Sequence, residues 1–197
     1  VDEDIDLIRR LSKLKQPDEL WVGDINGAWR RDQALRFSKA IDDVDIYLEQ
    51  PCRSYDECLS VRRRARHVVK LDEAFNTVDE VQRGLRDDAM DAIALKVSKF
   101  GGLTPSRIIR DVCDDAGIPM TIEDAWGSGI ATAAYAHLAA STSPRALLNT
   151  TDLHNYNTAQ LATGAPEVAD GRMWLSDRPG LGVVPDFALL SLRDVYE

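Results

Sequence analysis

Six short apolar segments of this chain each end in a charged residue, and these residues recur at a nearly constant interval. They are Asp24, Glu49, Asp72, Lys96, Asp124 and Asp152, with successive spacings of 25, 23, 24, 28 and 28 residues. Each interval has room for one strand and one helix, which is the size of a βα unit. Repeated βα units predict an α/β fold with a parallel sheet covered by helices.

Two parallel architectures satisfy this pattern. In a closed barrel, the six residues would lie at one rim, where barrel enzymes place their active sites. The alternative is an open, doubly wound sheet with scattered acids, but no Gly-x-Gly-x-x-Gly motif or P-loop follows any predicted strand. A complete barrel takes about 250 residues, and this chain has 197. We therefore predict the C-terminal part of a TIM-like (β/α) barrel with about six βα units, and expect the chain to belong to a longer polypeptide.

Charge and composition exclude several classes of partner. The net charge of -9 argues against nucleic acid or an anionic membrane surface as the main partner. No continuous apolar run reaches transmembrane length. The cysteines Cys52, Cys58 and Cys113 are odd in number and lack metal-binding spacing, so we expect free thiols and a cytoplasmic location.

The first three strand-end acids suggest a metal site. Asp24, Glu49 and Asp72 end three adjacent predicted strands, and converging carboxylates repel each other unless a cation lies between them. Hard oxygen ligands favour Mg²⁺ over zinc. The alternative is that each acid caps the following helix or pairs with a lysine.

Lys96 ends the next predicted strand and is the candidate acid/base. A nearby cation lowers the pKa of a lysine, which is what a general base near neutral pH requires. Lys99, three residues further on, could serve instead. A salt bridge from Lys96 to Asp72 or Glu73 is the structural alternative.

Four motifs at these strand ends resemble one known family, and they read Asp24-x-Asn26 followed by Trp29, Glu49-Gln50-Pro51, Asp72-Glu73 and Lys96-x-x-Lys99-x-Gly101-Gly102. Together they resemble the enolase superfamily of the muconate-lactonising-enzyme and mandelate-racemase type, over nearly the whole chain. The resemblance implies Asp24, Glu49 and Asp72 as Mg²⁺ ligands and Lys96 as one acid/base. It implies removal of a proton alpha to a carboxylate through an enediolate intermediate. It also implies a capping domain, two earlier strands and a second lysine motif, none of which lies in this chain.

Five further residues are candidates for binding the substrate or supporting the ligands: Asn26, Glu73, Asp124, Trp126 and Asp152. The segments 123–127 and 150–156, which contain the last three, are similar to those of hydroxyproline-acting members such as cis-3-hydroxy-L-proline dehydratases. The related proline-betaine epimerases carry a tryptophan near Thr151, where this chain has no aromatic residue. A carboxylate suits a protonated amine, whereas an aromatic face suits a methylated cation. This favours an unmethylated proline-like amino acid, although Asp124 and Asp152 could instead bind nearby backbone amides.

The repeating pattern defines the predicted domains. Residues 1–156 are predicted as the partial barrel with the metal and acid/base rim, and residues 157–197 as a C-terminal extension on the barrel or capping domain. We expect His154 to be a loop or pocket residue and His67 and His137 to be structural.

Three functions remain open from the residues together with this resemblance. The first is a Mg²⁺-dependent lyase that dehydrates a hydroxyproline such as cis-3-hydroxy-L-proline. The second is an epimerase or racemase of a proline-like amino acid, betaine or dipeptide. The third is a non-catalytic scaffold or inactive barrel fragment. For an enzyme, we expect a homo-oligomer that needs the N-terminal portion.

Overall fold

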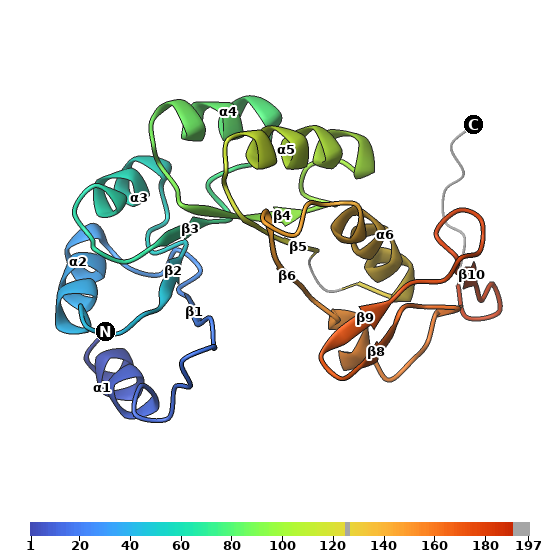
Figure 1. Ribbon diagram of the computed structural model, residues 1–197, viewed down its shortest axis with the longest axis horizontal. Coiled ribbons are helices and arrows are strands. Elements are labelled where there is room, and N and C mark those ends of the chain that lie inside the picture. The colour runs from blue at the N-terminus through green and yellow to red at the C-terminus, as the bar shows by residue number, and fades with distance from the viewer. Residues whose placement is uncertain (125–126, 191–197) are drawn as a thin grey trace. The chain divides into compact units, whose positions relative to one another are not determined.

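The computed structural model describes residues 1–124 and 127–190, which fall into two compact units (Figure 1). The units are Val1–Ala94 and Leu95–Glu197. The boundary between the units, after Ala94, is a different division from the predicted one after residue 156. The predicted division separates the barrel from its C-terminal extension, and it stays a prediction. Among the described residues, no helix is both long and apolar enough to cross a lipid bilayer.

The first unit alternates helices with short strands. Its elements are α1 (Asp2–Leu11), β1 (Val22–Asp24), α2 (Arg31–Ala40), β2 (Tyr47–Glu49), α3 (Tyr55–Arg62), β3 (Val69–Leu71), α4 (Val78–Arg86) and the start of β4 (Ala92–Lys96). The registers of β1 with β2, β2 with β3 and β3 with β4 are all parallel. The repeated βα units predicted from the sequence are therefore confirmed.

The second unit continues the pattern and then changes. It contains α5 (Leu103–Asp115), β5 (Met120–Glu123), α6 (Gly129–Ala140), β6 (Leu147–Thr150), the 3₁₀ helix η1 (Leu153–Tyr156), β7 (Ala162–Thr163), β8 (Glu167–Ala169), β9 (Arg172–Trp174) and β10 (Val184–Pro185). Strands β1 to β6 are neighbours in chain order, and the β5–β6 pairing is parallel. The last four strands form two antiparallel pairs, β7 with β10 and β8 with β9.

Helix starts follow the local capping signals. The sequence Thr77-x-x-Glu80 predicts a capping box, and this box opens α4. The Glu80 amide donates to the Thr77 hydroxyl, and the Glu80 carboxylate accepts from the Thr77 amide. Serine is a preferred N-cap residue, and Ser54 caps α3: its hydroxyl accepts from the Glu57 amide at 3.3 Å.

Helix α1 is shorter than predicted. Apolar spacing predicts a helix to Lys15, but α1 ends at Leu11. Ile5 and Ile8 pack against the core of the first unit, whereas Leu14 is 70% exposed. A longer helix would therefore bury no further apolar surface to offset the entropy of ordering it.

The first unit has an apolar core on the helix side of β2. Phe37 and Ile41 of α2 pack with Leu48 of β2, and the Trp29 ring lies 4.5 Å from the Phe37 ring between centroids. Helix α1 packs on α2, and α2 on α3 (Figure 1). Trp21 and Ile25, which flank β1, also pack against this core, so the layer contacts two of the strands that carry the predicted acids.

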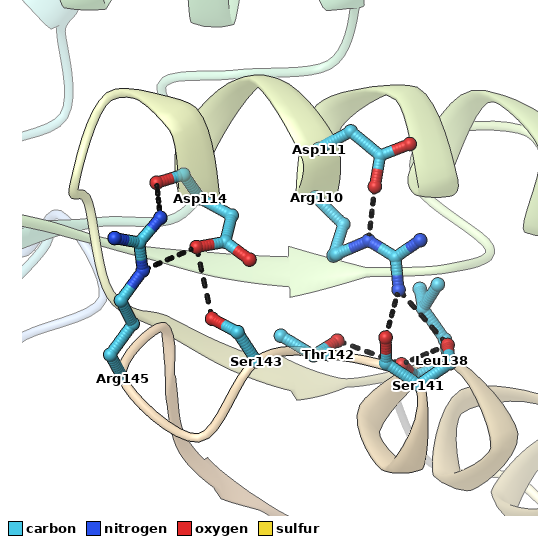
Figure 2. Close-up of polar contacts among 8 residues, drawn as sticks. All are labelled: Arg110, Asp111, Asp114, Leu138, Ser141, Thr142, Ser143 and Arg145. Carbon is cyan, nitrogen blue, oxygen red and sulfur yellow. Dashed lines mark hydrogen bonds and ion pairs between the residues drawn. The ribbon is translucent and has the colours of Figure 1, made fainter.

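Polar contacts join α5 to the segment after α6 in the second unit, as Figure 2 shows. Arg110 donates to the Ser141 carbonyl at 2.9 Å. Asp114 accepts from the Ser143 hydroxyl at 2.9 Å and from Arg145 Nε at 3.0 Å. These contacts fix the turn through which the chain enters β6.

Candidate functional site

The predicted acids lie at or just beyond the C-terminal ends of neighbouring strands, and two of them, Asp24 and Glu49, are in register. In the strand register, Asp24 of β1 lies opposite Glu49 of β2, and Glu49 lies opposite Lys70 of β3. Residues that lie opposite each other on neighbouring parallel strands point to the same face of the sheet. Side chains alternate along a strand, so a residue two positions further on points to that face as well. Asp72 comes two positions after Lys70. The first unit therefore brings all three predicted acids to one edge of the sheet.

Two of the three acids are buried. Glu49 is 5% exposed and Asp72 is 2% exposed, whereas Asp24 is exposed. A buried carboxylate is costly without a compensating partner. Lys70, itself only 3% exposed, supplies one for Glu49, with 2.8 Å between Nζ and Oε2. The lysine-pairing alternative is thus confirmed for Glu49.

Sequence reasoning missed Lys70, although its position carries a signal. Lys70 and Asp72 alternate with the buried Leu71, so both face the side opposite Leu71. A lysine inside an apolar strand next to an acid-bearing strand predicts a buried ion pair.

Asp24 is held by a local turn. Its Oδ1 accepts from the Asn26 backbone amide at 2.9 Å, and Asn26 and Gly27 have positive φ angles of 50° and 67°. Asparagine and glycine tolerate the left-handed region better than other residues, which explains these two residue types after the strand. Asn26 thus supports Asp24 through its backbone.

Gln50 connects the strand ends and was also missed as a functional candidate. It is fully buried and has a positive φ of 37°. Its Oε1 accepts from the amides of Asp72 and Ala74, at 3.1 Å and 3.2 Å. Its Nε2 donates to the Cys52 carbonyl at 2.9 Å. The motif Glu49-Gln50-Pro51 therefore contains a bridge between the loops after β2 and β3.

The donor set fits a hard divalent cation by its chemistry. Asp24, Glu49 and Asp72 offer carboxylate oxygens at one sheet edge, the ligand type that Mg²⁺ prefers. No group of three or more His, Cys, Asp or Glu side chains is gathered as a metal cluster within residues 1–124 and 127–190. The role of the three acids as ligands stays a prediction. The role of Glu73 in binding the substrate or supporting the ligands also stays a prediction, and its side chain is exposed.

Several hollows lie on the first unit, and two of them border α1. One of about 370 Å³ lies between α1 and β1, and Asp24 lines it together with apolar residues such as Trp29 and Phe37. A larger one of about 930 Å³ lies among charged side chains of α1 and contains none of the strand-end acids. Volume alone does not mark the chemistry, since the larger hollow has no convergent buried groups.

The second unit carries the remaining predicted residues. Lys96 is the last residue of β4. Asp124, 7% exposed, accepts from the Ser98 backbone amide at 2.9 Å, which confirms the backbone-amide alternative for this residue. Trp126 lies outside the described residues.

The chain after β6 carries Asp152 and His154. The Asp152 carboxylate accepts from the Asn155 side chain at 3.0 Å. His154, 4% exposed, lies in η1, and its Nδ1 has no hydrogen-bond partner among the described residues. In the first unit His67 is buried, with Nδ1 2.8 Å from the Ser38 hydroxyl, which agrees with the predicted structural role.

Comparisons with known proteins agree with this arrangement. The family model described as Enolase C-terminal domain-like matches residues 1–189. A cis-3-hydroxy-L-proline dehydratase from Roseibium aggregatum is 45% identical over 189 residues, which are 96% of this chain and 52% of that protein. This chain therefore spans about half the length of that relative.

Solved structures agree as well. The crystal structure of a mandelate racemase/muconate lactonizing enzyme from Roseovarius nubinhibens superposes with a TM-score of 0.93 at 46% identity, covering 97% of this chain and 52% of that one. An enolase superfamily member from the same organism, complexed with magnesium, superposes with a TM-score of 0.91 at 30% identity, covering 96% and 52%. The six βα units are thus part of a (β/α) barrel, and the chain belongs to the enolase C-terminal domain-like family.

Proposed function

We propose that the full-length protein is a Mg²⁺-dependent lyase that dehydrates a hydroxyproline such as cis-3-hydroxy-L-proline. The observation that carries the proposal is the row of carboxylates at one sheet edge, with Glu49 and Asp72 both buried. The 45% sequence identity to a cis-3-hydroxy-L-proline dehydratase supports the substrate class. A magnesium complex among the similar structures supports the metal.

Each residue then has a role that its chemistry supports. Asp24, Glu49 and Asp72 would hold the cation, which supplies Lewis-acid stabilisation of the negative charge that develops on the substrate carboxylate. Lys96, in its neutral amine form, would take the proton from the alpha carbon. Asp152 would bind the protonated ring amine of the substrate.

Dehydration follows from the loss of that proton. The electron pair of the broken C–H bond forms a double bond between the alpha and beta carbons, and the beta C–O bond breaks. The hydroxyl leaves as water after it receives a proton. The cyclic product tautomerises to an imine, which accounts for all atoms of the substrate.

The test is incubation of the full-length protein with cis-3-hydroxy-L-proline in D₂O with Mg²⁺, followed by NMR. We expect loss of substrate, appearance of the imine, and no turnover in a Lys96→Ala variant. Lys99→Ala is the matched control, because it removes the next lysine of the same motif and should retain activity. Full activity of Lys96→Ala would exclude its role as the base.

The same experiment separates the other functions. Deuterium at the alpha carbon without loss of water would identify an epimerase or racemase. If the protein shows no deuterium exchange and calorimetry detects no Mg²⁺ binding, it is a non-catalytic scaffold.

A further inference from the structure

Gln50 is tied to the loops after three neighbouring strands at once. Its backbone carbonyl accepts from the Gly27 amide at 2.8 Å, in the loop after β1. Its backbone amide donates to the Lys70 carbonyl at 2.9 Å, in β3. Its side chain accepts from the amides of Asp72 and Ala74 beyond the end of β3. One residue thus links the segments that carry all three strand-end acids.

The conformation of Gln50 indicates that these links are specific. A positive φ of 37° is sterically unfavourable for a residue with a side chain. Such a conformation persists only where the surroundings impose it, and it is concentrated at functional sites. The side chain is fully buried, and both ends are satisfied, since Nε2 donates to the Cys52 carbonyl.

The bond to the Asp72 amide acts directly on a candidate ligand. It fixes the backbone from which the Asp72 carboxylate extends, while the peptide that precedes Gln50 carries Glu49. The Glu49 carbonyl in turn accepts from the Ile25 amide at 3.0 Å, next to Asp24. A shift of the Gln50 side chain would therefore change the distances among the three carboxylates.

We infer that Gln50 is a positioning residue that sets the spacing of Asp24, Glu49 and Asp72, and with it the affinity of this edge for a divalent cation. The inference rests on the proposed function, because it takes these acids as the cation ligands. Gln50 itself touches neither metal nor substrate in this scheme. Groups that orient metal ligands typically change metal affinity about 10–100-fold when they are mutated.

The principal variant is Gln50→Met. Methionine matches the length of glutamine and meets the same backbone constraint, but it cannot accept from the amides of Asp72 and Ala74. The probe is Mn²⁺ in place of Mg²⁺, and its affinity for the full-length protein is read from the electron paramagnetic resonance signal of free Mn²⁺. We expect about 10–100-fold weaker binding than in the unmodified protein.

A second measurement works without any metal. Amide hydrogen exchange in EDTA reports the two bonds directly, so we expect faster exchange at Asp72 and Ala74 in Gln50→Met. Gln50→Glu retains a side-chain oxygen at the same reach and should restore protection of both amides. If the Asp72 and Ala74 amides exchange as fast in Gln50→Glu as in Gln50→Met, the proposed role of Oε1 as their acceptor is wrong.

Val81→Ala is the matched control for lost stability. Val81 is buried in α4 and its aliphatic side chain makes no hydrogen bond to the strand ends. We expect lower thermal stability but unchanged Mn²⁺ affinity in this variant. Equal loss of affinity in Val81→Ala and Gln50→Met would reduce Gln50 to a general stabilising residue.

The outcomes distinguish this inference from the proposed function. If the unmodified protein binds no Mn²⁺, the proposed function fails and the positioning role fails with it. If the unmodified protein binds Mn²⁺ and Gln50→Met binds it equally well, the inference alone is wrong.

Discussion

Removing the lysine of the buried pair Lys70–Glu49 tests the electrostatics of the strand ends. The perturbation is Lys70→Met, which retains the length of the side chain and removes its charge. Nζ lies 2.8 Å from Glu49 Oε2, and the two side chains are 4% and 7% exposed. Solvent therefore screens this pair little, unlike surface pairs, which contribute about 0–1 kcal/mol.

The expected loss follows from this burial. Removal of one partner of a buried ion pair leaves an uncompensated charge and costs about 3–5 kcal/mol. A domain of ordinary stability has about 5–15 kcal/mol of unfolding free energy, so the variant should be folded but clearly weakened. The double variant Lys70→Met with Glu49→Gln removes the buried charge. It should lose only about 1–3 kcal/mol, the cost of an unsatisfied buried amide.

The assay is urea unfolding of the full-length protein by circular dichroism at pH 7 in EDTA. The same measurement is then made in Mg²⁺. We expect Mg²⁺ to raise the unfolding free energy of Lys70→Met more than that of the unmodified protein, because a cation at Glu49 would replace the missing positive charge. A loss below about 1 kcal/mol in Lys70→Met, the range of surface pairs, would refute the reasoning. A double variant less stable than the single one would do the same.

Three further predictions concern packing, pH and metal removal. Gly84→Ala should destabilise the first unit by up to about 2 kcal/mol in urea unfolding: a Cβ there would lie 2.5 Å from Cζ of the buried Phe75 ring, and overpacking costs about 1–3 kcal/mol against about 1 kcal/mol of helix propensity. A more stable variant would contradict the clash. The hydrogen bond from Ser143, together with Arg145, holds the pKa of Asp114 below its usual value of 3.8, so its stabilising contribution is present above that pH and is lost as the pH falls through the lowered pKa. Acid unfolding of Asp114→Asn should accordingly be less steep below about pH 4; unchanged steepness would exclude the contribution. Removal of divalent cations with EDTA should abolish alpha-proton exchange in D₂O while the far-ultraviolet circular dichroism stays constant, and exchange that persists in EDTA would exclude a metal-dependent step.

Much of the fold was predictable because βα units have local signals. The capping box at Thr77 and the polar residue after each apolar strand depend on neighbours within one turn or one strand. Element ends were less predictable, as α1 shows. It ends at Leu11, one turn after Ile8, the last of its residues that packs on the core, and the core residues that Ile8 contacts lie far along the chain. The small antiparallel pairs after residue 161 were missed because their strands have two or three residues, too few for a periodic pattern.

The candidate site divides in the same way. Sequence alone located Asp24, Glu49 and Asp72 as acids that follow successive strands, because strand ends are readable from apolar runs. The pairing of Glu49 with Lys70 was missed, although a lysine inside an apolar strand is a signal for it. The hydrogen bonds from Asp72 and Ala74 to Gln50 have no comparable local signal, since these contacts join residues 21 to 24 positions apart.

The order of strands and helices, the acids at the strand ends and the family were determined by the sequence itself. Only the tertiary structure decided which acids are buried, that Lys70 neutralises Glu49, and that Gln50 links the loops. The reason is physical: helix and strand preferences arise from nearby residues, whereas burial and charge pairing arise between strands that the register brings side by side.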